Sequence, residues 1–316
     1  MFNDVVRHLV MGVLFFLPAS RRKSIDRWWR GREEHRKLHA ADWLLVSWGK
    51  SGRTWLRVML SRFYETHFRL PRHELLGFDN LHRRDARIPR VFFTHDNYLR
   101  DYTGHGYDTK VDFHGKKVVL LVRDPRDVAV SQYFQWKFRM RPHKKFINDY
   151  PPHGTDMPIF DFMMTEACGL PRVISYFNGW INGIPGVGNV LIVRYEDMRK
   201  DPGSVLANIL EFTGTPGSER EIADAVDYAA YDNLKKREAG TKSSWWHFQW
   251  RLAPGDASNP DSFKVRRAKV GGYRDYFSDD ELATIDSMVD RELLPGLGFT
   301  AAEQAGQADA GARAAS

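Results

Sequence analysis

The hydrophobic pattern of the chain alternates between short apolar runs and stretches with helical spacing. The first run, 43–46, passes into a glycine-containing loop, 47–52, and from Thr54 onward apolar residues recur every three or four positions. A run of about four apolar residues favours a buried strand, and the longer spacing favours an amphipathic helix. The segment that starts at Asp42 therefore predicts a strand, a loop and a helix in direct succession.

The same succession recurs further along the chain. The apolar run 117–122 ends at Arg123-Asp124-Pro125 and leads into a helix around 128–138, for which Pro125 suits the first turn. A short apolar strand at 91–94 ends at His95, and a third buried strand is expected at 190–193, with a helix from about 202 to 212. Strands that alternate with helices predict an α/β fold, a single domain whose central parallel sheet is flanked by helices.

Other segments lack these patterns. Residues 139–158 and 240–263 are rich in Pro, Gly, His and polar residues, so we expect long loops, which in compact domains usually carry function. Residues 301–316 hold mainly Ala, Gly, Gln and Asp without periodicity, which predicts an unstructured tail. We therefore divide the chain into an N-terminal segment 1–40, a domain 41–300 and a tail 301–316.

The N-terminal segment is amphipathic and basic. The apolar run from Leu9 to Leu17 is too short to cross a bilayer, which takes about 20 residues, and a basic stretch with two tryptophans follows it up to Lys37. Three interpretations stay open: contact of residues 5–37 with a membrane surface, a helix packed on its own domain, and a secretory signal. The absence of a clear small-x-small cleavage site weakens the last.

Composition narrows the partners and the cellular setting. The 47 Lys and Arg against 40 Asp and Glu give a formal net charge of +7, which favours anionic ligands or surfaces. Cys168 is the single cysteine, so no intramolecular disulfide can form, and no cysteine-rich or two-histidine zinc pattern is present. We expect a cytoplasmic protein, in contact with the inner face of the membrane if the N-terminal segment binds there, and no metal.

The loop at 48–55 has the chemistry of an anion site. Exposed N–H groups and the helix dipole at a helix N-terminus favour a phosphate, Lys50 adds a positive charge, and Gly52 lets the backbone approach closely. Ser51 and Thr54 add hydroxyl donors. The loop does not fit the ATP-binding pattern G-x-x-x-x-G-K-[ST], because its first glycine would fall on Leu44.

This loop resembles the phosphosulfate loop of the sulfotransferases that use 3′-phosphoadenosine-5′-phosphosulfate (PAPS), which reads roughly P-K-S-G-T-T-W. The match is Lys50-Ser51-Gly52-Arg53-Thr54-Trp55, with Gly49 in place of the proline and Arg53 in place of a threonine. Three more motifs follow in the family's order, in the segments 123–131, 194–198 and 266–274. The resemblance covers about residues 42–292 and implies the P-loop NTPase-like sulfotransferase fold.

The resemblance also implies which residues bind PAPS. Arg123 and Ser131 fall on the arginine and serine of the 3′-phosphate motif, and Arg266, Arg267 and Ala268 fall on the segment that closes over this phosphate, where Ala268 replaces a glycine. Tyr195 matches the family's tyrosine at a strand end, and Tyr231 stands where an aromatic flanks the adenine. The implied co-substrate site comprises Lys50, Ser51, Gly52, Arg53, Thr54, Trp55, Arg123, Ser131, Tyr195, Tyr231, Arg266, Arg267 and Ala268.

The expected general base is His95, which follows the strand 91–94 and resembles the histidine of the family's K-T-H motif. Its unperturbed pKa lies near 6.5, so it can accept a proton near neutral pH. The family's lysine two residues earlier is Phe93 here, which removes one cation. Lys50 remains to stabilise the leaving phosphate oxygen as a second catalytic residue. Arg53 either replaces the missing charge or is a loop arginine without a role.

The sequence thus predicts a sulfotransferase that moves a sulfuryl group from PAPS to a hydroxyl or amine of a small molecule, releasing 3′-phosphoadenosine-5′-phosphate (PAP). The basic segment 139–145 and the aromatic-rich segment 245–250 suggest a lipid, glycolipid or carbohydrate acceptor. An ATP-dependent kinase is the alternative enzyme, and a non-catalytic basic protein that binds nucleic acid or membrane is the alternative from another class. We expect no nucleic-acid partner.

Overall fold

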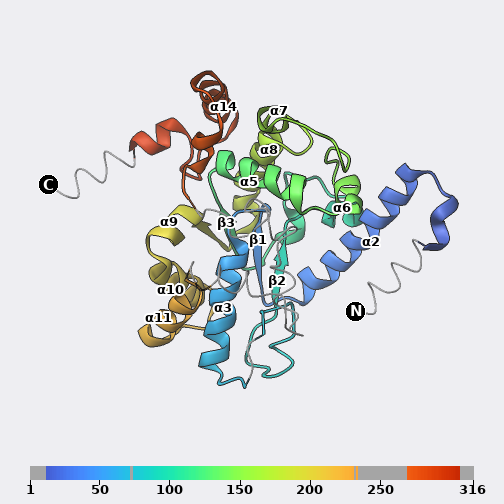
Figure 1. The fold of residues 1–316 in the computed structure, drawn as a ribbon. Helices are drawn as coiled ribbons and strands as arrows, with labels where there is room; N and C mark the ends of the chain where they lie inside the picture. Colours follow the sequence, from blue (N-terminus) through green and yellow to red (C-terminus); the bar gives the residue numbers. More distant parts are fainter. Residues whose placement is uncertain (1–11, 72–73, 231–232, 234–268, 307–316) are drawn as a thin grey trace.

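The computed structural model describes residues 12–71, 74–230, 233 and 269–306 of the 316-residue chain. The helices and strands bear the labels of Figure 1. In chain order they are η1 (Leu14–Phe16), α2 (Ala19–Ala40), β1 (Trp43–Ser47), α3 (Arg53–His67), β2 (Val91–Thr94), α4 (Leu99–Thr103), η2 (Val111–Phe113), β3 (Val118–Val122), α5 (Pro125–Phe138), α6 (Pro142–Ile147), α7 (Ile159–Met163), α8 (Leu170–Val187), β4 (Val190–Arg194), α9 (Tyr195–Lys200), α10 (Pro202–Thr213), α11 (Glu219–Tyr228), η5 (Gly272–Tyr276) and α14 (Asp279–Glu292).

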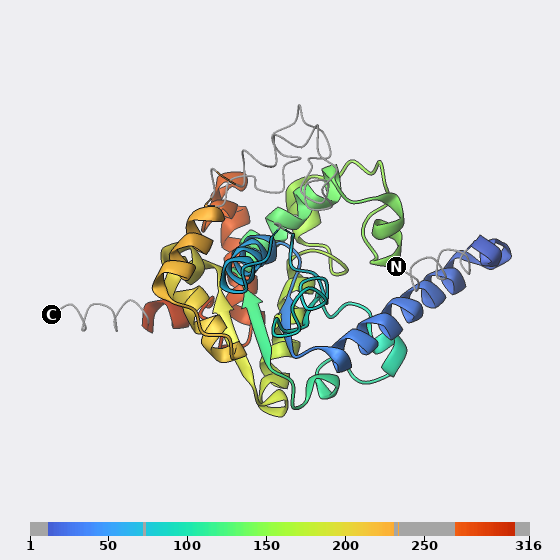
Figure 2. The same cartoon turned by 90° about the horizontal axis from the view of Figure 1, so that it is seen from below.

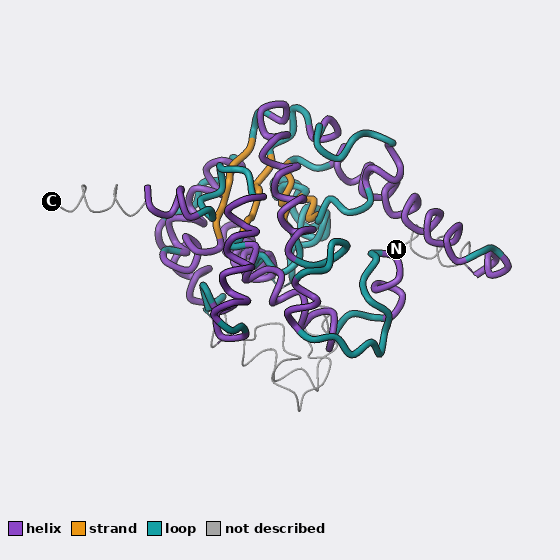
Figure 3. The backbone as a smooth tube through the Cα atoms, turned by 90° about the horizontal axis from the view of Figure 1, so that it is seen from above, coloured by secondary structure: helices purple, strands orange, loops and turns teal. Residues whose placement is uncertain are grey.

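The sheet is parallel, with strand order β2-β1-β3-β4, and Figure 3 shows its strands enclosed by helices. Side chains alternate between its two faces. Leu44 and Val46 pack in one hydrophobic core with residues of α5, α8 and α14, whereas Leu45 packs in a second core with residues of α3, α10 and α11. The predicted α/β class and the parallel sheet with helices on both faces are confirmed.

The third predicted strand differs from the prediction in its burial. β4 is the last strand of the sheet, and only Val193 of its five residues is buried, while Ile192 is 36% exposed. An edge strand has a neighbour on one side only, so its apolar side chains are covered less completely than those of β1 and β3.

Two segments predicted to lack structure contain helices. The stretch 139–158 holds α6, which begins with Pro142 in its first turn. Residues 301–306 are also helical, where the sequence predicts the start of a tail, because Thr300 and Glu303 form reciprocal bonds at the helix start. The rest of that tail, and the expected loop 240–263, lie outside the described residues.

The helix α2 packs against α4, α6 and β2 of the domain. Its N-terminal end projects beyond the domain, as Figure 2 shows. Arg27 forms an ion pair with Asp101 of α4 at 2.9 Å, and Gly31 lies so close to α4 that an added Cβ would be 2.3 Å from the Tyr98 carbonyl oxygen. At the free end, Phe15 and Phe16 are 76% and 68% exposed. Residues 19–40 therefore follow the packed-helix interpretation, and the contact that the exposed end makes stays a prediction.

Candidate functional site: two anion-binding turns on one cavity

The turns after β1 and β3 lie side by side. Parallel neighbouring strands end at the same edge of the sheet, which brings the loop 48–52 next to Arg123. The Nη1 of Arg123 donates to the Lys50 carbonyl oxygen at 3.5 Å. Lys50, Thr54, Arg123 and Ser131 all line a single cavity of about 1000 Å³. The two predicted phosphate motifs therefore face one common space.

The loop before α3 is held in an unusual backbone conformation. Lys50 and Gly52 have positive φ angles of 76° and 95°, and Gly52 directly precedes the first residue of the helix. A Cβ at Gly52 would lie 2.5 Å from Cδ2 of Tyr195, so both the angle and the space require glycine. This conformation turns the loop onto the helix N-terminus, where backbone N–H groups favour an anion.

Two polar atoms of this loop have no hydrogen-bond partner within the described part of the chain. They are the Oγ of Ser51 and the Nη1 of Arg53, both of them buried. Arg53, Thr54 and Trp55 line the cavity, whereas Ser51 does not. An unsatisfied guanidinium nitrogen beside a helix N-terminus fits an anionic oxygen, so the residues present suit a phosphosulfate group.

An aromatic and cationic wall borders the loop. The rings of Trp55 and Tyr195 lie 6.1 Å apart in an edge-to-face arrangement, and the Arg123 guanidinium lies 4.4 Å from the Tyr195 ring centroid. Arg199 approaches Trp55 at 5.6 Å, and all four side chains line the cavity. Flat rings next to phosphate-binding groups can accommodate a purine. Tyr231, predicted for the same role, lies outside the described residues.

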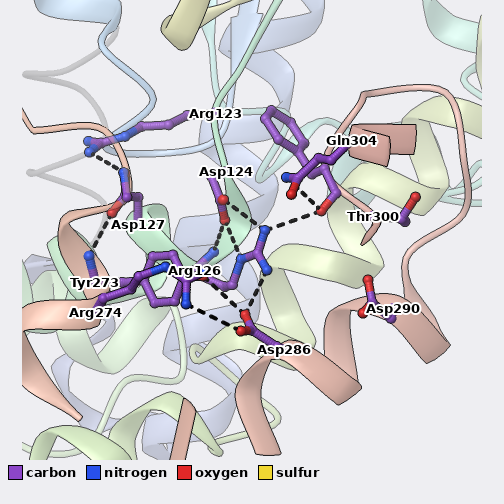
Figure 4. A network of polar contacts seen from close by, with 12 residues as sticks. Arg123, Asp124, Arg126, Asp127, Tyr273, Arg274, Asp286, Asp290, Thr300 and Gln304 are labelled. Atoms are coloured by element: carbon purple, nitrogen blue, oxygen red, sulfur yellow. Dashed lines mark hydrogen bonds and ion pairs between the residues drawn. The ribbon is translucent and has the colours of Figure 1, made fainter. Parts of the chain in front are cut away.

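Asp127 is a site residue that the sequence analysis left without a role. Its carboxylate accepts hydrogen bonds from Arg123 Nη2 at 3.0 Å, from the Gly271 amide at 3.0 Å and from the Tyr273 amide at 2.9 Å. As Figure 4 shows, it holds the chain around 271–273 against the second motif. Its position four residues after Arg123, one helical turn on, is the signal that could have revealed it. Arg266, Arg267 and Ala268, which immediately precede this docked segment, lie outside the described residues.

Arg126 belongs to the same motif but has a structural role. Its guanidinium is almost fully buried and bonds to Asp124 of its own motif, to Asp286 of α14 and to the Phe299 carbonyl oxygen. Figure 4 shows these contacts on the side of the motif away from Arg123. They attach the C-terminal part of the chain to the N-terminus of α5.

His95 lies at the end of β2 and lines the same cavity. Its Nδ1 is 2.6 Å from the Ser47 carbonyl oxygen, and its Nε2 is 2.6 Å from Nη2 of Arg53. A carbonyl oxygen only accepts, so Nδ1 carries the proton of the neutral ring. The expected base and the phosphosulfate loop are therefore in direct contact through Arg53.

Comparison with known proteins identifies the family. The family model described as "Sulfotransferase domain" matches residues 40–298. This chain belongs to the sulfotransferase domain family. The reaction class that the motifs predicted, sulfuryl transfer, is thereby confirmed against the kinase and the basic binding protein.

Curated relatives and solved structures agree with this assignment. The sulfotransferase is 24% identical to a flavonol 3-sulfotransferase of Flaveria bidentis, over 83% of this chain and 84% of the relative, and 24% identical to cytosolic sulfotransferase 17 of Arabidopsis thaliana, over 83% and 77%. A mouse sulfotransferase crystallised with PAP has the same fold, with a TM-score of 0.55 and 19% identity over 88% of this chain and 94% of the other. The structure of retinol dehydratase in complex with androsterone and PAP has a TM-score of 0.52 and 18% sequence identity, over 80% of each chain.

In this sulfotransferase the helix α2, which lies before the matched domain, also lines the cavity. Glu34 accepts hydrogen bonds from Thr94 Oγ1 at 3.4 Å and from the Tyr98 amide at 3.2 Å. Burial, with a contribution from the nearby Asp96, raises the pKa of Glu34 from 4.5 to about 7. Arg27 bonds to the Asn97 and Ile147 carbonyl oxygens. The sequence analysis missed both residues, because the pattern of α2 does not show which surface it covers.

The sulfotransferase cavity is basic away from the phosphate motifs as well. Arg139, Arg141 and Lys144, from the segment around α6, line it together with Arg172 of α8.

Within the described residues there is no cluster of His, Cys, Asp and Glu suited to a metal ion. The helices of that same portion include none with the length and apolarity needed to cross a membrane.

Proposed function

We propose that His95 is the general base of this sulfotransferase and that Lys50, Arg53 and Arg123 hold the phosphosulfate and 3′-phosphate groups of PAPS. The observation that carries the proposal is the shared cavity, on which both phosphate motifs and His95 lie. The 5′-phosphosulfate suits the first turn of α3 together with Lys50. The 3′-phosphate suits Arg123 and Ser131. The adenine suits the aromatic rings of Trp55 and Tyr195.

In the reaction, the acceptor oxygen forms a bond to sulfur while the bond from sulfur to the phosphate oxygen breaks. The acceptor proton passes to His95 Nε2, for which the hydrogen bond from Nδ1 to Ser47 fixes the tautomer and ring orientation. Lys50 and Arg53 supply positive charge where negative charge grows on the leaving phosphate oxygen. The chain's own contribution is thus positioning, a base and electrostatic stabilisation.

We infer a small-molecule acceptor with a hydroxyl or amine, and within this class a lipid, glycolipid or carbohydrate that bears a negative charge. The cations Arg139, Arg141 and Lys144 on the cavity wall support an anionic acceptor. The exposed Phe15 and Phe16, followed by the basic α2, support contact with a membrane that would present a lipid acceptor. One relative is named a flavonol sulfotransferase and another a cytosolic sulfotransferase. A soluble aromatic alcohol is therefore the alternative acceptor.

The His95→Ala variant tests the catalytic assignment. We expect sulfate transfer from PAPS to fall by at least about 100-fold, since general-base catalysis contributes roughly 10²–10⁴-fold, while PAP binding measured by calorimetry stays within about threefold of wild type. Transfer at a near wild-type rate would remove His95 from the mechanism.

The acceptor is found by mass spectrometry of lipids and glycans from cells with and without the protein, as a species heavier by one sulfuryl group.

The donor itself is tested separately with PAP and ATP. Binding of PAP without Mg²⁺, and no binding of ATP, is the expected result. The reverse pattern contradicts the proposed donor site. Binding of any polyanion, weakening uniformly with salt and unaffected by His95→Ala, would instead indicate a purely electrostatic surface.

A further inference from the structure

Arg53 forms a hydrogen bond with the nitrogen of His95 that would accept a proton in base catalysis. The neutral ring carries its proton on Nδ1, which donates to the Ser47 carbonyl oxygen, so its lone pair is on Nε2. Nη2 of Arg53 lies 2.6 Å from this Nε2 and has only hydrogens to offer. The guanidinium therefore donates to the position at which the acceptor hydroxyl must donate.

This contact and base catalysis exclude each other. A lone pair that accepts a short hydrogen bond from Arg53 cannot at the same time take the proton of an acceptor. A guanidinium so close to Nε2 also repels the positive charge that His95 would gain. His95 can act as a base only after Arg53 has moved away from it.

Arg53 has a second donor that could bind an anion. Nη1 of Arg53 is buried without a hydrogen-bond partner in the described part of the chain, and the residue itself begins α3, whose N-terminus favours anions. Burial also lowers the pKa of Arg53 to about 10, so pairing with an anion would be favourable in this position.

The neighbouring arginine is engaged elsewhere. The guanidinium of Arg57, one turn further along α3, covers the Phe93 ring at 4.7 Å and donates to the Leu76 carbonyl oxygen. Phe93 stands where the resembled family has a lysine, and Arg57 is stacked on its ring. Of these two arginines, Arg53 is the one whose guanidinium contacts the expected base.

We propose that Arg53 exchanges partners during the reaction, leaving His95 Nε2 for a sulfonate or phosphate oxygen of PAPS. The proposal rests on the proposed donor site. The exchange brings a cation to the transferring group and frees the base in one movement. Removal of the acceptor proton is then confined to protein that has already bound the donor.

The test follows the His95 Nε2 nitrogen by NMR in full-length protein with ¹⁵N-labelled histidine, assigned with the His95→Gln variant. Arg53→Met keeps the bulk of the side chain without its donors, and Arg57→Met is the matched control on the same helix. We expect the Nε2 resonance to differ between wild type and Arg53→Met and to be unchanged in Arg57→Met. PAPS, added without acceptor, should move the wild-type resonance toward that of Arg53→Met.

The comparison separates exchange from mere proximity of the donor. PAPS added to Arg53→Met gives its direct effect on Nε2, and exchange predicts a clearly larger change in wild type. Equal changes in both proteins, or the same starting resonance in both, would overturn the proposal. Arg53→Lys, which keeps the charge on a differently shaped head group, replaces Arg53→Met if that variant does not fold, with the same two comparisons. Calorimetry on the same samples reports PAPS binding, so a failure of the donor site is recognised as such.

Discussion

Gly52 and Tyr195 approach so closely that no side chain fits between them. A Cβ on Gly52 would lie 2.5 Å from Cδ2 and 2.9 Å from Cε2 of the tyrosine ring. The loop that begins α3 and the aromatic wall of the cavity are therefore fixed relative to each other by direct contact. The affinity for the nucleotide should depend on this packing.

Gly52→Ala should weaken PAP binding by at least about tenfold, or roughly 1.4 kcal/mol. The φ angle of 95° and the clash with Tyr195 together force the loop to shift. Calorimetry with PAP measures the effect. Gly104→Ala is the control, because Gly104 also has a positive φ, 74°, but nothing lies within 4 Å of its added Cβ. It should lower the melting temperature and leave PAP affinity unchanged, and equal loss of affinity in both variants would contradict the assignment.

Asp127→Asn should also weaken PAP binding by about tenfold. The carboxylate accepts bonds from Arg123, Gly271 and Tyr273, and an amide would point its NH₂ group at one of these donors. Arg123 and the segment 271–273 should then lose their fixed positions. Asp201→Asn is the control, since Asp201 caps α10 outside the cavity and asparagine caps a helix equally well. Unchanged PAP affinity in Asp127→Asn would show that this network does not support the site.

Glu34 should make stability depend on pH. Its pKa rises from 4.5 to about 7 on folding, so the folded protein binds the extra proton and is favoured at low pH. This stabilisation is present below about pH 4.5 and is lost as the pH rises to 7. Across this range the free energy of unfolding should fall by roughly 3 kcal/mol, because one pKa unit corresponds to about 1.4 kcal/mol.

The pH dependence can be isolated with Glu34→Gln. Between pH 5 and pH 8, chosen to bracket the folded pKa of about 7, the melting temperature of wild type should fall relative to this variant. Glu33→Gln, which changes a neighbour that pairs with Arg36 and Lys37 on the surface of α2, should follow wild type. Parallel curves for all three proteins would mean that Glu34 is charged throughout this range.

The exposed segment η1, which precedes α2, should bind anionic vesicles. Replacing both Phe15 and Phe16 by serine should reduce co-sedimentation with phosphatidylcholine–phosphatidylserine vesicles by about tenfold or more, because burying one phenylalanine contributes about 1.5–3 kcal/mol. Val111→Ser is the control, as Val111 is 38% exposed in η2. If wild type does not sediment with these vesicles, the membrane interpretation is wrong.

The donor half of the site was predictable because its signals are local. Lys50 and Arg123 each come shortly after an apolar run that favours a buried strand, and parallel neighbouring strands place their ends on one sheet edge. The sequence could not show that Arg53 contacts His95, since 42 positions separate them and only the pairing of β1 with β2 brings them together.

The cavity walls formed by α2 and by the segment with α6 were less predictable for the same physical reason. Glu34 reaches the cavity because Gly31 allows α2 to pack tightly on α4, a contact between residues more than 60 positions apart that leaves no periodic signal. The segment with α6 was predicted as a loop because residues 139–158 are rich in Pro, Gly, His and polar residues. Its apolar positions are too few to show helical spacing.

The helix α2 contributes to the cavity from outside the domain that the family model matches. The family match begins at residue 40, yet Arg27 and Glu34 on the preceding helix reach the cavity next to the loop that carries His95. Changes in this helix would alter the cavity wall next to His95, whereas the loop 48–52 and Arg123 lie on other elements. This helix is therefore a compact target for changing the cavity next to the proposed base.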